Sequence, residues 1–212
     1  MRVPRHIGVI PDGNRRWAVQ AGMEKKDGYE RGLEPGVRLL NLARENHIEE
    51  ITYYGFTVDN CKRPKEQVEA FQKACVDAVN LIAENDVSLL VVGNDESKMF
   101  PKELLKYRKR VDIGKGGIKV NFLVNYGWEW DLENTSLATG KRELWTSLKT
   151  ADISRVDLII RWGGRRRLSG FLPIQSVYSD FYVLDTLWPD FTEQDFYRAL
   201  AWYQEQDITL GG

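Results

Sequence analysis

The stretch His6-Ile-Gly-Val-Ile-Pro-Asp-Gly-Asn-Arg-Arg-Trp-Ala18 determines the fold that we expect, because it joins a short apolar run to a charged turn. Residues Ile7–Ile10 predict a buried strand, and Arg15–Ala21 predict a helix that begins just beyond it. The turn between them contains Asp12 and Gly13. In α/β proteins ligands bind beyond the carboxyl ends of the strands, so this turn is a candidate binding site.

The same alternation continues along the chain. Further strands are expected at Ile51–Phe56, Val87–Val92, Ile118–Val124, Val156–Ile160 and Phe181–Leu184. Helices are expected at Leu33–Asn46, Pro64–Ala83, Lys102–Val111, Lys141–Leu148 and Thr192–Gln204, the last with a capping box formed by Thr192 and Asp195. This order predicts an α/β fold with a mainly parallel central sheet flanked by helices. The polar stretch Glu133–Gly140 predicts a loose segment.

Composition limits the class of protein. The 212 residues, 42% hydrophobic and 29% charged, predict one globular domain over residues 1–212. A formal net charge of −1 disfavours nucleic acid as a partner. The two cysteines form neither a disulfide framework nor a zinc motif, so we expect a cytoplasmic protein. No apolar stretch has the length of a membrane span, and any membrane contact is expected to be transient.

Three charged stretches follow expected strands. In the first, Arg15 and Arg16 offer donors to a phosphate, while Asp12 would repel it unless a cation such as Mg²⁺ lies between them. In the second, Tyr54–Pro64, polar side chains and Arg63 precede a helix. In the third, Arg161–Phe171, four arginines and a serine surround a Gly-Gly bend, which favours an anion site. The alternatives are a capped turn, a polar loop and a solvated basic loop, respectively. The long helix Val68–Ala83 fits either core packing or the lining of a hydrocarbon tunnel.

These stretches resemble the motifs of the cis-prenyltransferases, the family that includes undecaprenyl diphosphate synthase. The resemblance runs from His6 to Phe196. It rests on the opening stretch and on Tyr54-Gly-Phe-Thr-Val-Asp-Asn-Cys-Lys-Arg-Pro64, Asn125-Tyr-Gly127, Asp157-Leu-Ile-Ile-Arg161 and Leu187-Trp-Pro-Asp-Phe191. It implies a fold with an apolar substrate tunnel, a requirement for Mg²⁺ and a homodimer.

The resemblance also implies roles for individual residues. Asp12 and Asp180 correspond to metal ligands, and Asp12 and Asn60 to catalytic residues, with Asn60 at the position proposed to accept a proton. Substrate contacts are implied for Gly13, Asn14, Arg15, Arg16, Trp17, Lys25, Tyr29, Thr57, Val58, Asp59, Cys61, Arg63, Arg161, Arg167, Leu168 and Ser169. Of these, Arg161, Arg167 and Ser169 are expected to hold a second diphosphate.

Several positions depart from the usual family pattern. Tyr29 replaces a histidine, Arg15 a small residue, Gln67 a glutamate, Cys61 a tryptophan and Arg165 a glutamate. The stretch Arg161–Pro173 is similar to that of cyclolavandulyl diphosphate synthase, which represents the irregular branch of the family. The expected activity is therefore condensation of an allylic diphosphate with isopentenyl or dimethylallyl diphosphate, with irregular head-to-middle as well as head-to-tail coupling.

Two rival functions remain open at this stage. One is a terpene synthase or phosphatase on the same fold, which would remove diphosphate from a single substrate. The other is a non-catalytic partner subunit, although such subunits tend to lose the motif aspartate that is present here as Asp12. Walker-A, G-x-G-x-x-G, H-E-x-x-H and G-x-S-x-G motifs are absent from the sequence.

Overall fold

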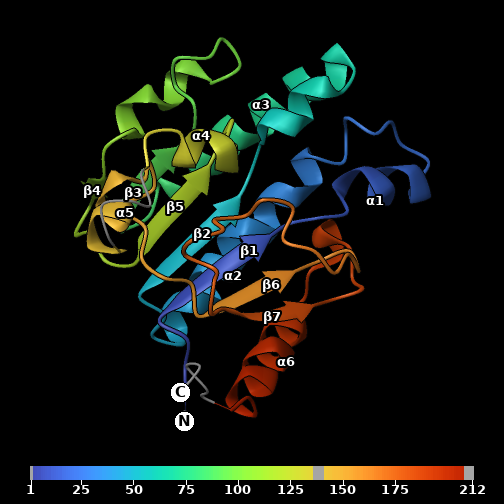
Figure 1. Cartoon of the computed structure of the whole chain (residues 1–212). Coiled ribbons are helices and arrows are strands. Elements are labelled where there is room, and N and C mark those ends of the chain that lie inside the picture. The colour runs from blue at the N-terminus through green and yellow to red at the C-terminus, as the bar shows by residue number, and fades with distance from the viewer. Residues whose placement is uncertain (1, 136–140, 208–212) are drawn as a thin grey trace.

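A seven-stranded sheet forms the centre of the molecule in the computed structural model, which describes residues 2–135 and 141–207 (Figure 1). The strands are β1 (His6–Ile10), β2 (Glu50–Tyr54), β3 (Val87–Val92), β4 (Val111–Ile113), β5 (Lys119–Leu123), β6 (Leu158–Arg161) and β7 (Asp180–Val183). They lie in the order β4-β3-β5-β2-β1-β6-β7. Only the β3–β4 pair is antiparallel among the pairings of these strands, so the expected α/β fold with a mainly parallel sheet is confirmed.

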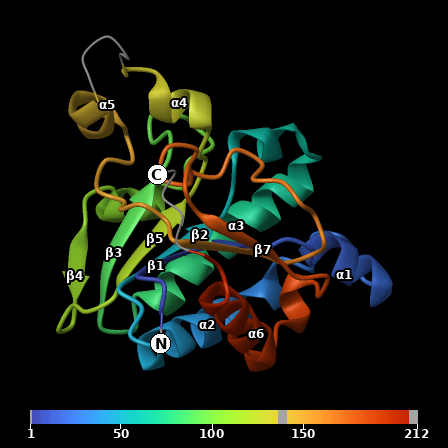
Figure 2. The same cartoon turned by 60° about the horizontal axis from the view of Figure 1, so that its bottom comes forward.

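The helices cover the two faces of the sheet unequally (Figure 2). They are α1 (Asn14–Gln20), α2 (Leu33–Glu45), α3 (Lys65–Ile82), α4 (Trp128–Leu132), α5 (Lys141–Ser147) and α6 (Glu193–Gln204). Helices α2, α3 and α6 share one apolar core with the sheet, to which Leu39, Val79 and Phe196 contribute. A smaller core on the opposite face joins the sheet to the chain around Ile153 and Phe171.

Most expected elements are present with ends shifted by one or two residues. The capping box of Thr192 and Asp195 is also confirmed, because each residue accepts the backbone N–H of the other. The helix expected at Lys102–Val111 is shorter and of another type than expected. A 3₁₀-helix spans Lys102–Tyr107, and Val111–Ile113 then pairs with β3 as β4. The short helix α4 was not predicted. Of the expected loose segment Glu133–Gly140, residues 136–140 lie outside the described residues.

The parallel arrangement brings the ends of β1, β2 and β6 to the same edge of the sheet. Ile10, at the end of β1, pairs in register with Arg161, at the end of β6. The charged stretches that follow these strands therefore meet at one place, next to the start of α1 and α3 (Figure 1). Within the described parts of the chain, no helix is both long enough and apolar enough to cross a membrane.

A buried polar network lies near the opposite edge of the sheet. The Nδ1 atom of His6 lies 3.1 Å from the carbonyl oxygen of Ser154, and Nε2 lies 2.8 Å from Oγ1 of Thr52. Asn121 connects Thr52 to Glu50 by donating to both side chains. A neutral imidazole with its hydrogen on Nδ1 satisfies these contacts. Burial is the main cause that lowers the pKa of His6 from its ordinary value of 6.5.

We expect the lowered pKa of His6 to make the protein less stable in mild acid. Because the unfolded chain then binds a proton more readily than the folded chain, stability is fully present above about pH 6.5 and is lost as the pH falls below it. One such proton changes the free energy of unfolding by at most about 1.4 kcal/mol per pH unit. Denaturant titrations from pH 7.5 to 5 measure this slope. His6→Gln should flatten it, whereas His47→Asn, at the exposed second histidine, should leave it unchanged. If His6→Gln has the same slope as the wild type, His6 does not cause the pH dependence of stability.

Candidate active site

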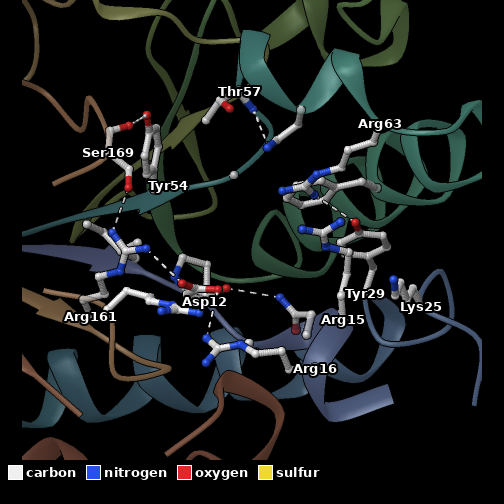
Figure 3. A pocket seen from close by; sticks show the side chains of 18 of the residues that line it. Asp12, Arg15, Arg16, Lys25, Tyr29, Tyr54, Thr57, Arg63, Arg161 and Ser169 are labelled. Carbon is white, nitrogen blue, oxygen red and sulfur yellow. Dashed lines mark hydrogen bonds and ion pairs between the residues drawn. The ribbon is translucent and has the colours of Figure 1, made fainter. Parts of the chain in front are cut away.

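A cavity of about 800 Å³ lies beyond the carboxyl ends of β1, β2 and β6 (Figure 3). Its lining brings together residues from all three charged stretches. The charged residues of the lining are Asp12, Arg15, Arg16, Lys25, Asp59, Arg63, Arg161, Arg165 and Arg167. Seven cations thus face two carboxylates in a chain whose net charge is −1. A concentration of cations of this kind is suited to highly charged anions such as diphosphates.

Asp12 occupies the centre of this cavity and Arg161 holds it there. The guanidinium of Arg161 donates to Oδ2 of Asp12 at 2.9 Å and to Oγ of Ser169 at 2.9 Å, and it also contacts the carbonyl oxygen of Arg167. Its side chain is 5% exposed, whereas that of Asp12 is 32% exposed. The planar fork of an arginine can hold several acceptors at once. Arg161 therefore connects the turn after β1 to the basic loop after β6.

The turn after β1 depends on glycines at two close approaches. Gly13 has φ 116°, and a Cβ atom there would lie 2.9 Å from the side chain of Leu187. Gly163 has φ 81°, and a Cβ atom there would lie 2.3 Å from the guanidinium of Arg16. That guanidinium donates to the carbonyl oxygen of Gly163 at 2.8 Å and pairs with Asp12 at 3.4 Å. The two glycines thus allow the turn and the basic loop to pack together.

Tyr29, Arg63 and Phe71 form a second cluster on the other side of Asp12 from Arg161. The Arg63 guanidinium donates to the Tyr29 hydroxyl at 2.9 Å, and the Tyr29 ring stacks on Phe71 with 4.5 Å between centroids. Burial lowers the pKa of Arg63 and raises that of Tyr29. Arg15 lies close by and donates to Oε1 of Gln67 at 3.3 Å. No described residue forms an ion pair with Arg15, Lys25 or Arg63, so these cations are available to an anion.

Polar groups complete the rim of the cavity. Thr57 and Asn60 form a capping box, in which Oδ1 of Asn60 accepts the backbone N–H of Thr57 at 3.0 Å. Asp59 pairs with Lys62 at 2.7 Å and is largely exposed. The hydroxyl of Tyr54 donates to the carbonyl oxygen of Ser169 at 2.7 Å. The loop after β2 is thereby tied to the loop after β6.

The structure gathers most, but not all, of the residues expected to contact substrate. The two expected catalytic residues, Asp12 and Asn60, both line the cavity. So do twelve of the residues expected to contact substrate, namely Gly13, Asn14, Arg15, Arg16, Lys25, Tyr29, Thr57, Asp59, Arg63, Arg161, Arg167 and Ser169. Four lie outside its lining, namely Trp17, Val58, Cys61 and Leu168. Val58 packs against Gly127, and the Cys61 thiol is 3.7 Å from Oδ1 of Asn125.

Trp17 faces away from the cavity, and this leads to a prediction. Its indole N–H donates to Oδ1 of Asp190 at 2.7 Å, next to the 3₁₀-helix Trp188–Asp190. We expect Trp17→Phe to lower stability by about 1 kcal/mol through loss of that hydrogen bond, with activity changed by less than about threefold. Thermal denaturation and steady-state rates measure the two effects. Asp190→Asn serves as the control, because its side chain keeps an acceptor. A loss of activity of more than about tenfold in Trp17→Phe would contradict this prediction and support a contact between Trp17 and substrate.

Within one chain Asp180 lies far from Asp12, so the structure does not bring the two residues expected as metal ligands together. Asp180 begins β7 in register with Leu158, which is itself in register with Ile7. Three strand residues, or about 10 Å, separate that level from the end of β1, and Asp12 lies further on. Asp180 instead pairs with Arg2 at 3.4 Å. The described residues contain no group of three or more potential metal-ligating His, Cys, Asp or Glu side chains.

Two aromatic residues of the cavity lining were not among the expected site residues. Tyr54 is the last residue of β2, and Phe71 lies on the first half of α3. Each was assigned to an apolar strand or helix, although each lines the cavity. The signal for Tyr54 was its position, since the last residue of a parallel strand faces the ligand edge. The sequence holds no comparable signal for Phe71, because its position depends on stacking with Tyr29.

The fold and the site together define an enzyme that acts on phosphorylated substrates, and comparison with known proteins specifies the family. The family model described as putative undecaprenyl diphosphate synthase matches residues 10–211. The ditrans,polycis-undecaprenyl-diphosphate synthase ((2E,6E)-farnesyl-diphosphate specific) of Yersinia pseudotuberculosis is 31% identical over 100% of this chain and 91% of its own length. The enzyme of that name from Escherichia coli K12 is also 31% identical, over 98% of this chain and 90% of its own.

One solved structure has the same fold as this chain. Lavandulyl diphosphate synthase from Lavandula x intermedia, in complex with dimethylallyl diphosphate, superposes with a TM-score of 0.86 at 22% identity, covering 99% of this chain and 98% of its own. The chain belongs to the undecaprenyl diphosphate synthase family of cis-prenyltransferases. It is thus an enzyme that transfers prenyl groups.

The donor set at Asp12 fits the Mg²⁺ ion that the family resemblance implies. Proteins commonly hold Mg²⁺ by one or two carboxylates together with phosphate oxygens of the substrate. Asp12 supplies one partly exposed carboxylate among the cations that would bind those phosphates. Both oxygens of Asp12 contact arginines here, so an ion at this position would share the carboxylate with Arg161 and Arg16.

Proposed function

We propose that this enzyme is a Mg²⁺-dependent prenyl diphosphate synthase that condenses an allylic prenyl diphosphate with a second isoprenoid diphosphate. The observation that carries the proposal is the placement of two cationic sets on opposite sides of Asp12 (Figure 3). Arg15, Lys25 and Arg63 lie on one side, and Arg161 with Ser169 lies on the other. One diphosphate on each side would place two prenyl chains in a single cavity of about 800 Å³.

The first chemical step is rupture of the allylic C–O bond, which leaves an allylic cation and pyrophosphate. Negative charge grows on the departing oxygens, and Arg15, Arg16 and Arg63 are placed to bind them. Fixed charges that face such an oxygen stabilise the transition state without reorganising during the reaction. Mg²⁺ bound at Asp12 would neutralise part of the same charge. Arg161 orients Asp12 for this role.

The second step forms the new carbon–carbon bond. The double bond of the second substrate attacks the allylic carbon, and the resulting cation loses a proton. The side-chain oxygen of Asn60 already accepts the Thr57 backbone N–H, and a neutral amide is a weak base. We therefore infer that a phosphate oxygen of the released pyrophosphate accepts the proton, while Asn60 and Thr57 position the reacting carbons. Holding both substrates in one cavity supplies much of the remaining acceleration.

Irregular coupling is the finer part of the proposal. Its support is the clustering of Arg15, Tyr29 and Gln67, three departures from the usual family pattern, around one side of the cavity. Arg15 adds a cation there, and the Tyr29 hydroxyl accepts a hydrogen bond from Arg63. A change in where one diphosphate binds would also shift the prenyl chain attached to it. A different carbon of that chain would then face the allylic cation. Dimethylallyl diphosphate would then serve as acceptor as well as donor.

The rival functions are less well supported by the same geometry. A terpene synthase or phosphatase needs one diphosphate site, whereas cations lie on both sides of Asp12. A non-catalytic subunit would have no need for the ion pairs that hold Asp12 in the cavity.

Product analysis tests the proposed activity. The enzyme is incubated with Mg²⁺ and dimethylallyl, geranyl or farnesyl diphosphate, each with and without isopentenyl diphosphate, and dephosphorylated products are identified by mass spectrometry. Coupled products in any mixture support the synthase, and coupled products without isopentenyl diphosphate support irregular coupling. Free alcohol or hydrocarbon from a single substrate would favour the rival enzyme, and no turnover at all would favour the partner subunit.

A homodimer remains a proposal. Its support is the exposure of three large hydrophobic side chains, namely Trp128, Val177 and Tyr178, which are 45%, 62% and 59% exposed. Large apolar side chains of this kind often mark a protein interface. Sedimentation velocity measures the state in solution, and a monomer at micromolar concentration would contradict the proposal.

A further inference from the structure

The basic loop after β6 has an uncommon backbone conformation at Ser169, the residue that joins Arg161 on one side of Asp12. Ser169 has φ 54°, and the following Gly170 has φ 80°. The left-handed region is uncommon for residues other than glycine, and such a conformation persists only where surrounding contacts hold it. Ser169 is exposed, so packing against a core does not hold it. Its conformation therefore depends on specific hydrogen bonds.

Two hydrogen bonds hold Ser169 from opposite ends. The hydroxyl of Tyr54 donates to the carbonyl oxygen of Ser169 at 2.7 Å, a normal length for a bond of this kind. The side-chain Oγ of Ser169 accepts from Arg161 at 2.9 Å. Figure 3 shows these bonds on the side of the cavity away from Lys25. Tyr54 thus fixes the backbone of Ser169, and that backbone determines where Oγ lies.

The ring of Tyr54 is itself held in place. It is 8% exposed and makes edge-to-face contacts with Phe171 and Tyr126, at 5.3 Å and 6.2 Å between centroids. Tyr126 is fully buried, and its hydroxyl donates to Oδ2 of Asp131 at 2.9 Å. Burial also raises the pKa of Tyr54, so its hydroxyl keeps the hydrogen that it donates. Tyr54 is therefore a rigid support for Ser169.

We propose that Tyr54 is a positioning residue for the second diphosphate, because its hydroxyl holds Ser169 in the conformation that keeps Oγ beside Arg161. The inference rests on the proposed function, since it concerns the diphosphate of the acceptor. Tyr54 lines the cavity, but its hydroxyl is already used by Ser169. It acts through Ser169 and not by contact with substrate. The acceptor then meets a site that is ordered before it binds, which lowers the cost of binding.

The first test compares two neighbouring tyrosines. Tyr54→Phe keeps the ring and removes only the hydroxyl, and we expect the KM of the acceptor to rise about tenfold, the upper range for one hydrogen bond. The KM of the allylic donor should change by less than about twofold. Tyr53→Phe is the matched control, because it also loses a 2.7 Å bond from a buried hydroxyl to a carbonyl oxygen, that of Gly36. Tyr53 points to the other face of β2. Both variants should melt at similarly lowered temperatures, but only Tyr54→Phe should change the ratio of the two KM values.

A double-mutant cycle shows whether Tyr54 acts through Ser169. Ser169→Gly removes Oγ, and glycine adopts a positive φ at little cost. This change alone should weaken acceptor binding by about tenfold. Adding Tyr54→Phe to it should weaken binding further by less than about twofold, because the group that Tyr54 positions is already absent. If the two effects multiply to about 100-fold, Tyr54 acts independently of Ser169 and the inference is overturned.

A binding measurement separates this inference from the proposed function. Unreactive thiodiphosphate analogues of isopentenyl and dimethylallyl diphosphate are titrated calorimetrically into the wild type and the same variants. If the wild type binds them but couples no substrates, the proposed function fails, and the cycle in dissociation constants still decides the role of Tyr54. Equal dissociation constants in Tyr54→Phe and Tyr53→Phe would overturn the inference. A wild type that binds neither analogue would overturn both.

Discussion

Replacing Asp12 by asparagine is expected to lower kcat by about 10³-fold while strengthening the binding of free pyrophosphate in the absence of Mg²⁺. The two effects have one cause. Asparagine keeps the size of the side chain and an acceptor for Arg161, but it removes one of the two carboxylates that face seven cations. A bare anion then meets less repulsion, whereas a metal ion loses its charged ligand.

Two measurements distinguish this explanation from simple misfolding. Single-turnover rates with the preferred donor report the chemical step, and calorimetric titration of pyrophosphate reports the anion site. Asp190→Asn makes the same chemical change outside the cavity and should alter neither quantity by more than about twofold. Weaker pyrophosphate binding in Asp12→Asn would mean that Asp12 mainly holds the arginines in place. An activity within about tenfold of wild type would remove Asp12 from the catalytic role.

The sequence was sufficient to predict the edge of the sheet at which the site lies. Hydrophobic runs located the strands, and the charged stretches after three of them indicated where ligands bind. The chemistry of Asp12, Arg161 and Ser169 was expected from the family resemblance, and the structure places all three within one hydrogen-bonded group. That agreement arises because parallel strands fix where the following residues meet.

Local patterns gave no indication of a residue's position where that position depends on contacts between distant segments. Trp17 has the residue type of a substrate contact, yet its indole pairs with Asp190, 173 residues away in sequence. Asp180 was placed at the metal because its motif resembles the family pattern, but strand register puts it near the opposite edge of the sheet. Tyr54 was assigned only to a strand. Its hydrogen bond to Ser169, 115 residues away in sequence, is one that no local pattern encodes.

Replacing Arg161 by lysine is expected to lower kcat/KM by about 10²- to 10³-fold and the free energy of unfolding by about 2 kcal/mol. Lysine keeps the positive charge, so a loss of activity would arise from geometry and not from net charge. The guanidinium holds Asp12, Ser169 and the carbonyl oxygen of Arg167 together, and an ammonium group cannot reach all three in the same plane. Its burial makes any acceptor that it leaves unpaired costly.

The pattern of the loss identifies which side of Asp12 depends on Arg161. If Arg161 and Ser169 hold the second diphosphate, the KM of the acceptor should rise more than that of the allylic donor. Arg155→Lys, a matched change at an exposed arginine before β6, should leave both constants and the stability unchanged. Equal increases in the two KM values would show that Arg161 acts only through Asp12, and an unchanged kcat/KM would contradict its role altogether. Because Arg161 is the residue that joins the turn after β1 to the basic loop, these outcomes decide whether the two cationic sets serve one substrate or two.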